Sequence, residues 1–416
     1  MEQTHPTLSS KSEALIEKEN KYGAHNYHPL PVVLDRGEGV FVWDVDGKKY
    51  YDFLSAYSAV NQGHCHPKIV GAMVKQAQTL TLTSRAFYND QLGVYEEYVT
   101  NYFGFDKVLP MNTGAEAVET ALKLCRKWAY EVKGIPENQA QIVVCENNFH
   151  GRTTTIISFS NDEGARKSFG PFTAGFIKIP YDDTEALEKV LKSTTNIAGF
   201  LVEPIQGEAG VYVPTEGYLA KAKALCEAHN VLFIADEVQT GIARTGKLLA
   251  VNHENVQPDI LILGKAISGG VYPVSAVLTN NVIMDVIKPG QHGSTFGGNP
   301  VAAAVAMAAL EVVREEKLSE NAERLGIILR KGLNDIASRN PLISLVRGKG
   351  LLNAIVIDCD EESDLAWNIC LKFRDYGLLA KPTHGNKIRL APPLVMTEAQ
   401  IQDCLVIIEK ALNDFK

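Results

Sequence analysis

Several features that mark whole classes of protein are missing from this sequence. It has no block of Lys and Arg, and its net charge is −8, so composition gives no support to binding of nucleic acids or anionic membranes. No run approaches the ~18 apolar residues of a membrane span. Residues 1–20 show neither a secretory apolar core nor an Arg-rich amphipathic presequence. We therefore expect a cytoplasmic protein.

Cysteine occurs without a pattern. The seven cysteines are scattered, none forms a CxxC pair and their number is odd, which indicates free thiols in a reducing compartment. The sequence His64-Cys65-His66 suggests a metal site, but its spacing does not suit one face of a helix. No second Cys/His cluster completes it, and we expect no metal.

Nucleotide-binding motifs are also lacking. Gly264-Lys265 resembles the end of a P-loop, yet Ala266 stands where Ser or Thr is needed, and Asp259 stands where the first Gly should be. No GxGxxG opens a helix after a strand, so the sequence does not support a dinucleotide-binding domain either.

The order of the expected elements indicates the fold class. The 416 residues suffice for about two or three domains. Strands and helices alternate up to about residue 317, which predicts right-handed crossovers and a mostly parallel sheet flanked by helices. Beyond it the order becomes helix, strand, helix, strand, helix. We predict an α/β protein with an N-terminal segment (1–57), a large domain (58–317) and a smaller α+β C-terminal domain (318–416).

Residues 231–270 carry the most informative pattern. Two apolar runs, at 231–235 and 260–263, predict short strands buried on both faces. The first is followed by Asp236 and the second by Gly264 and Lys265. Because ligands of open α/β sheets lie beyond the carboxyl ends of the strands, we expect the acid and the amine to meet in one crevice.

An acid and an amine placed together have a specific chemical use. A lysine amine in a partly dry site can lose its proton and add to a carbonyl, while a carboxylate keeps a facing pyridine nitrogen protonated. Together they describe a site for pyridoxal 5′-phosphate (PLP). Taken alone, the same residues also fit a solvated strand end and a capping Asp.

The wider sequence favours the first interpretation. The stretches LFIADEVQTGIARTGK, PDILILGKAISGG and GSTFGGNP resemble the class III (ω) aminotransferases, which are PLP enzymes of fold type I. The resemblance runs from Tyr22 to the C-terminus, with the motifs in the order of the family. It implies PLP carried by Lys265, with Asp236 at the ring nitrogen and Gln239 at the ring hydroxyl.

Further cofactor contacts are expected at a helix start. Thr113 and Glu116 fit a capping box, and Gly114 and Ala115 leave the first amides of the helix open. Such an end can bind a phosphate, although alone the motif fits an ordinary capped helix. Beside Lys265, we assign Gly114 and Ala115 to the phosphate of PLP.

The resemblance adds three more cofactor contacts. It implies that Phe149 covers the pyridine ring. It also implies that Ser294 and Thr295 lie on a loop that reaches the phosphate in the neighbouring subunit of a homodimer.

Five residues are expected to bind substrate. Arg152 suits a carboxylate, and Arg389 lies in an apolar strand end where a guanidinium needs a partner. By resemblance Glu208 is an acidic gate, Tyr57 narrows the substrate channel and Tyr27 receives the α-amine of the substrate. Taken alone, Tyr27 fits interface packing and Arg152 fits a surface ion pair.

The resemblance is greatest to family members that move the δ-amino group of L-ornithine to 2-oxoglutarate. The products are then glutamate and glutamate-5-semialdehyde, which cyclises to pyrroline-5-carboxylate. The first alternative is an aminotransferase for N-acetylornithine or another ω-amino acid. The second, from a different class, is a non-catalytic binding protein on the same fold.

Overall fold

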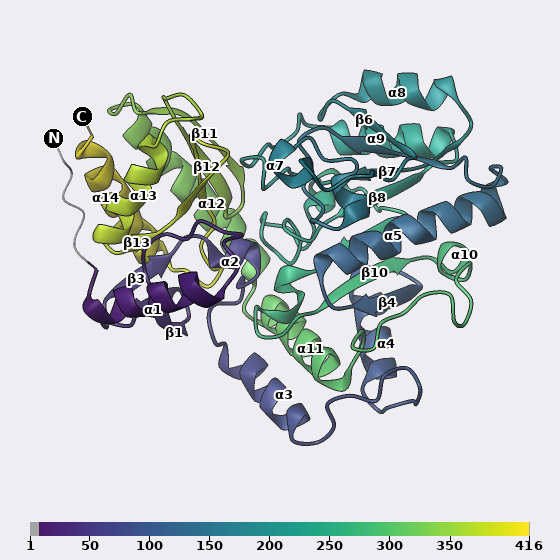
Figure 1. The fold of residues 1–416 in the computed structure, drawn as a ribbon, viewed down its shortest axis with the longest axis horizontal. Coiled ribbons are helices and arrows are strands. Elements are labelled where there is room, and N and C mark those ends of the chain that lie inside the picture. Colours follow the sequence, from purple (N-terminus) through teal and green to yellow (C-terminus); the bar gives the residue numbers. More distant parts are fainter. Residues whose placement is uncertain (1–7, 416) are drawn as a thin grey trace.

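The largest element of the structure is a seven-stranded sheet (Figure 1). A computed structural model describes residues 8–415. The strand order is β4-β10-β9-β8-β7-β5-β6, and β10 runs antiparallel to both of its neighbours while the other pairs are parallel. The prediction of a mostly parallel sheet is confirmed. The strands are β4 (Lys107–Met111), β5 (Gln141–Cys145), β6 (Phe176–Ile179), β7 (Ile197–Val202), β8 (Leu232–Asp236), β9 (Ile260–Leu263) and β10 (Ser275–Thr279).

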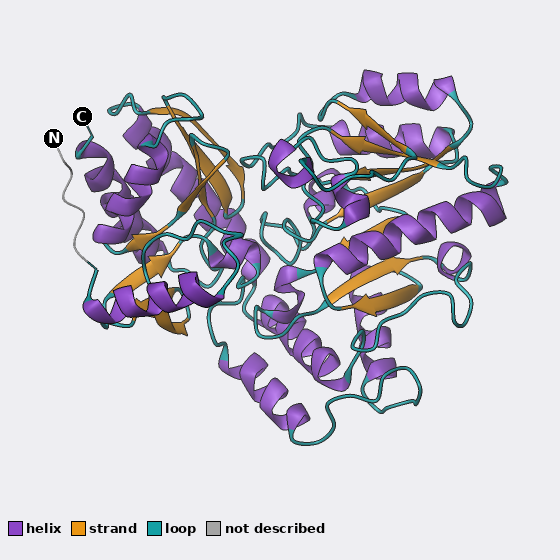
Figure 2. Cartoon of the chain, in the orientation of Figure 1, coloured by secondary structure: helices purple, strands orange, loops and turns teal. Residues whose placement is uncertain are grey.

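The central strands are buried on both faces, as their apolar runs predict. In β8, Leu232 and Ile234 belong to the core under helix α5 (Gly114–Trp128). Phe233 and Ala235 point the other way, into the core formed with α9 (Tyr218–Ala228) and α11 (Pro300–Glu315). Figure 2 shows these strands enclosed between helices. A parallel strand covered on both sides has no polar face, so its sequence is continuously apolar.

The remaining strands form two four-stranded sheets. One has the order β1-β2-β3-β13, in which the short β13 pairs in parallel with β3. The other is antiparallel, with the order β11-β12-β15-β14. The strands of the N-terminal segment therefore share a sheet with the C-terminal part of the chain, and the boundaries at 57 and 317 stay predictions. The strands are β1 (Leu34–Glu38), β2 (Phe41–Asp44), β3 (Lys49–Asp52), β11 (Ile343–Lys349), β12 (Leu352–Ile357), β13 (Leu378–Leu379), β14 (Lys381–Thr383) and β15 (Lys387–Leu390).

The helix starts follow the expected capping chemistry. Thr113 and Glu116 form the capping box of α5. Asn299 caps α11, with Pro300 in its first turn. Residues 8–415 contain no helix whose length and hydrophobicity would suit a bilayer-spanning segment. The remaining α-helices are α1 (Ser10–Tyr22), α2 (Ser55–Ser58), α3 (Pro67–Ala77), α4 (Leu92–Phe103), α6 (Thr154–Ile157), α7 (Glu163–Arg166), α8 (Thr184–Ser193), α10 (Asn281–Met284), α12 (Leu318–Ala337), α13 (Leu365–Asp375) and α14 (Glu398–Asn413).

Candidate active site

Lys265 follows the end of β9 and is held in an unusual backbone conformation. Its φ is 46°, in the left-handed region, which costs about 1–3 kcal/mol for a residue with a side chain. The preceding Gly264 is tightly packed, because a Cβ there would lie 3.2 Å from Val238 Cγ1. Burial and the nearby Arg389 lower the pKa of Lys265 to about 8. The amine therefore gives up its proton far more readily than an ordinary lysine, as a nucleophile or base requires.

Asp236 ends the neighbouring strand β8 and is held by two donors. Its Oδ2 accepts a hydrogen bond from His150 Nδ1 at 2.6 Å, and its Oδ1 accepts one from the Val238 amide at 3.0 Å. Burial alone would lower the pKa of His150, but its hydrogen bond to Asp236 and the charge of that carboxylate outweigh burial and raise it. The hydrogen bond in turn fixes the position of the Asp236 carboxylate at the end of β8.

An inner cavity of about 190 Å³ joins these groups. The sequence-based expectation that Lys265 and Asp236 share a crevice is met, because both line it. Gly114 and Ala115, at the start of α5, line the same cavity. Their amides have no hydrogen-bond acceptor among residues 8–415, since the Thr113 hydroxyl accepts from the amide of Glu116 instead. The complete lining is Gly114, Ala115, Phe149, His150, Gly151, Glu203, Ile205, Asp236, Val238, Gln239, Thr240 and Lys265.

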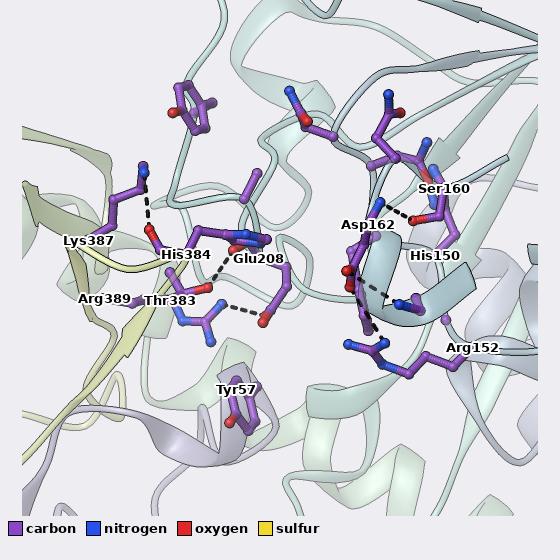
Figure 3. A pocket seen from close by; sticks show the side chains of 18 of the residues that line it. Tyr57, His150, Arg152, Ser160, Asp162, Glu208, Thr383, His384, Lys387 and Arg389 are labelled. Atoms are coloured by element: carbon purple, nitrogen blue, oxygen red, sulfur yellow. Dashed lines mark hydrogen bonds and ion pairs between the residues drawn. The ribbon is translucent and has the colours of Figure 1, made fainter. Parts of the chain in front are cut away.

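A larger outer cavity of about 610 Å³ shares Phe149, His150 and Gly151 with the inner one. All five expected substrate residues line it, although they come from distant parts of the sequence. Figure 3 shows Arg152 and Arg389 on opposite sides of this cavity, with Tyr57 next to Arg389. Two fixed cations that face each other suit a ligand with a carboxylate at each end. The five residues are Tyr27, Tyr57, Arg152, Glu208 and Arg389.

Arg389 finds its partner in Glu208. The guanidinium is only 2% exposed, and its Nη1 lies 2.9 Å from Glu208 Oε2. The same nitrogen lies 3.3 Å from Gly207 O and from Gln239 Oε1. Burial would raise the pKa of Glu208, but the charge and hydrogen bond of Arg389 outweigh it and lower this pKa. The pair is therefore ionised, and each charge neutralises the other.

Tyr57 lies in a strained turn. All four residues of α2 have positive φ, with 60° at Tyr57, whereas an L-residue loses about 1–2 kcal/mol in a left-handed turn. Asp52 stabilises the entry to this turn by accepting hydrogen bonds from the amides of Leu54 and Ser55 at 2.8 and 2.9 Å. The turn places the Tyr57 ring 4.9 Å from Arg389 Cζ.

Arg152 and Tyr27 are more open. Arg152 lies 3.6 Å from Asp162 with 60% of its side chain exposed, and its Cζ lies 5.5 Å from the centre of the Phe149 ring. Exposed ion pairs of this kind contribute little, so Arg152 can exchange Asp162 for a substrate carboxylate. Tyr27 is 72% exposed at the edge of the cavity.

The family profile Aminotransferase class-III matches residues 22–412. This chain belongs to the class III aminotransferase family. A protein of Drosophila ananassae named "Ornithine aminotransferase, mitochondrial" is 63% identical over 407 residues, which are 98% of this chain and 93% of that protein. The aminotransferase fold expected from the sequence is confirmed by solved structures.

Two of these structures are particularly informative. The acetylornithine aminotransferase of Elizabethkingia anophelis is 67% identical, with a TM-score of 0.90, over 97% of this chain and 99% of that one. An ornithine aminotransferase of Toxoplasma gondii is 50% identical, with a TM-score of 0.95, over 97% of this chain and 94% of that one. That Toxoplasma gondii structure has partial occupancy of PLP at its active site.

The inner cavity fits the cofactor of this aminotransferase, PLP. The unpaired amides of Gly114 and Ala115 suit a phosphate, the amine of Lys265 suits an aldehyde, and the carboxylate of Asp236 suits a pyridinium nitrogen. Phe149 supplies a flat apolar wall. The phosphate, the aldehyde and the ring nitrogen of PLP thus each find a matching group among the residues present.

Two cofactor predictions concern a loop outside both cavities. Ser294 Oγ accepts hydrogen bonds from Asn112 Nδ2 at 2.8 Å and from the Gly297 amide at 3.1 Å, and Thr295 is exposed. Neither residue lines the inner cavity of its own chain. Their contact with a neighbouring subunit stays a prediction.

Sequence reasoning missed three residues that position the groups of the inner cavity. His150 and Val238 hold Asp236. Glu203 follows β7 and accepts a hydrogen bond from the Phe149 amide at 2.8 Å, and burial raises its pKa to about 7. The signal for Glu203 was present, because an acid directly after a buried strand is the pattern that identified Asp236.

Proposed function

We propose that this aminotransferase moves the δ-amino group of L-ornithine to 2-oxoglutarate, forming glutamate-5-semialdehyde and glutamate. The observation that carries the proposal is the ion pair of Glu208 and Arg389 in a cavity that Arg152 and Tyr27 also line. The names of the curated relatives in Drosophila and rat agree with this substrate.

Lys265 and Asp236 carry the chemical step. When bound, PLP supplies an aldehyde that takes up the amino group and a ring that accepts electrons from the substrate carbon. Lys265 Nζ, whose pKa is lowered to about 8, takes a proton from the substrate carbon and delivers it to the carbon that the PLP aldehyde supplies. Asp236, held by His150, offers its carboxylate to the ring nitrogen of PLP when the cofactor is bound.

With ornithine, the ion pair stays closed. Glu208 neutralises Arg389, so the α-carboxylate of ornithine goes to Arg152 on the opposite side. The α-amine is then placed at Tyr27, and the δ-amine is left to point towards Lys265. The ion pair thus selects which of two amines reacts.

With glutamate, the ion pair opens. Glu208 turns away, and Arg389 binds the α-carboxylate while Arg152 binds the side-chain carboxylate. The α-amine of glutamate then faces Lys265. Because the two donors use the cavity in turn, the reaction follows ping-pong kinetics.

N-acetylornithine is the nearest alternative donor, and the name of the E. anophelis relative favours it. Its acetylated α-amine has no positive charge for Tyr27 to meet. We expect ornithine to be consumed first when the enzyme receives equal amounts of both donors with 2-oxoglutarate. Faster consumption of N-acetylornithine would refute the choice of ornithine.

A second measurement tests the alternative of a non-catalytic binding protein on this fold. The purified protein should absorb visible light through its cofactor, and the absorption should shift when ornithine is added. The absorption band that arises from the bond between PLP and Lys265 should be absent in Lys265→Ala. A colourless protein that stays colourless after incubation with PLP would refute any aminotransferase function.

The active enzyme is proposed to be a homodimer in which the loop of Ser294 and Thr295 reaches the partner's phosphate site. Support comes from the exposure of Thr295 and of Phe296, which is 51% exposed. Sedimentation equilibrium should give twice the chain mass, and a monomer with full activity would refute the shared site. The cytoplasmic location stays a prediction, since the name of the Drosophila relative places that protein in mitochondria.

A further inference from the structure

Strand β14 lies at the edge of the C-terminal sheet and borders the outer cavity. Its residues Lys381 and Thr383 are two positions apart, so their side chains share one face of the strand, and both line the cavity. The strand pairs with β15 in a register that sets Lys381 opposite Arg389. The backbone of β14 is thus joined directly to the strand that carries the substrate arginine.

Thr383 holds the loop that carries Glu208. Its Oγ1 donates a hydrogen bond to the Glu208 carbonyl oxygen at 2.7 Å (Figure 3). Two residues further on, Gly210 O accepts a hydrogen bond from Arg347 Nε at 2.8 Å. These bonds do not involve the Glu208 carboxylate. They therefore fix the backbone of Glu208 whether its side chain is paired with Arg389 or turned away.

Lys381 holds the segment that carries Tyr27. Its Nζ donates a hydrogen bond to His28 O at 2.7 Å. The His28 ring also stacks on Trp367, with centroids 4.4 Å apart and planes inclined by 7°. Tyr27 itself is 72% exposed, so its position depends on how its neighbour is anchored.

We propose that β14 sets the substrate selectivity of the enzyme through Lys381 and Thr383 as positioning residues. This inference rests on the proposed function. Thr383 fixes the acid that masks Arg389, and Lys381 fixes the tyrosine that receives the α-amine of ornithine. Because the strand ladder links both to Arg389, the three recognition points keep constant separations while the two donors alternate.

Isosteric variants separate the two anchors. Thr383→Val removes the hydroxyl at nearly constant volume, and the loss of one hydrogen bond should lower kcat/KM for ornithine about fivefold. Some of the ornithine should then react at its α-amine. Lys381→Met should raise KM for ornithine about fivefold and leave the glutamate half-reaction within about twofold, because glutamate does not use Tyr27.

Conservative variants provide the matched controls. Thr383→Ser keeps the hydroxyl and Lys381→Arg keeps a donor, so both should restore the parent selectivity. A purely structural role would lower both half-reactions together, without a change in product. Thermal unfolding of each holoenzyme monitors folding, and Thr383→Ala tests the same hydroxyl should valine prevent folding.

Glu208→Gln distinguishes a failure of the role of β14 from a failure of the ion-pair mechanism. If this variant loses ornithine selectivity while Thr383→Val and Lys381→Met equal their controls, the role of β14 is refuted and the proposed function stands. If Glu208→Gln keeps its selectivity, the ion-pair mechanism is refuted, and the role of β14 falls with it.

Discussion

Replacement of Glu208 by Gln should change which amine of ornithine reacts. The substitution removes the charge that masks Arg389, whose side chain is 2% exposed and 2.9 Å away. The unmasked guanidinium then attracts the α-carboxylate of ornithine from Arg152. Ornithine bound in this reversed direction presents its α-amine to Lys265 instead of its δ-amine.

The size of the effect follows from the contact that is lost. Hydrogen bonds to charged groups contribute about 1.5–3 kcal/mol, roughly a 10- to 150-fold change in an equilibrium. Because Gln keeps an oxygen acceptor for Arg389 Nη1, we expect the lower end of this range. The share of α-amine reaction should rise about tenfold, and kcat/KM for ornithine should fall by a similar factor. Glutamate, which binds with the pair open, should react within about threefold of the parent rate.

The assay must distinguish two isomeric products. Reaction at the δ-amine gives pyrroline-5-carboxylate after cyclisation, whereas reaction at the α-amine gives pyrroline-2-carboxylate, which has the same mass but a different NMR spectrum. Glu361→Gln is a matched control, because Glu361 lines the same cavity but pairs with Lys387. An unchanged product ratio in folded Glu208→Gln would refute the selection mechanism.

Three further predictions concern the inner cavity and Arg152. In the cofactor-free protein, burial lowers the pKa of Lys265 to about 8, so its labelling by an acylating reagent, followed by mass spectrometry, should rise with a midpoint near pH 8. A midpoint above pH 10 would contradict this. Since the unfolded chain binds this proton up to its ordinary pKa of 10.5, the stability of the cofactor-free protein should rise between about pH 8 and 10.5, and Lys265→Met should lack that rise in denaturant titrations. His150→Asn removes the imidazole that bonds to Asp236 Oδ2 and should weaken PLP binding about tenfold in reconstitution titrations; unchanged affinity would show that Asp236 needs no support. Arg152→Lys loses the two-pronged contact and should raise KM for ornithine and glutamate alike, about tenfold, and an effect on one donor alone would contradict its shared role.

The sequence predicts the inner cavity better than the outer one. Asp236 is the last residue of one buried strand, Lys265 lies two residues beyond another, and Gly114 and Ala115 start a capped helix. Strand burial and helix capping are local patterns, visible within a few residues. The parallel sheet then brings these strand ends together by geometry that holds for the whole fold class.

The outer cavity depends on contacts that have no local pattern. Lys381 and His28 are 353 positions apart, and Thr383 and Glu208 are 175 apart. Nothing around Tyr57 indicates four successive residues with positive φ, because that strain is tolerated only through tertiary contacts. Family resemblance named the residues that we propose to touch substrate. It did not identify the strand that positions two of them.

The contrast between the inner and the outer cavity predicts where donor selectivity changes within the family. Groups of the inner cavity hold one another, as Asp236 and His150 do, so most substitutions there would disturb cofactor binding and abolish activity with every donor. The outer cavity combines the Tyr27 segment, the α2 turn, the Glu208 loop and β14. The residues with which they line it, such as Tyr27, Tyr57 and Glu208, do not line the inner cavity with Lys265. Relatives named for ornithine and for acetylornithine, at 63% and 67% identity to this chain, should therefore agree in the inner cavity and differ in these four segments. Exchanging the Tyr27 segment together with β14 between two such enzymes should transfer donor preference, whereas exchanging either one alone should lower activity with both donors, because the anchor between Lys381 and His28 would be mismatched.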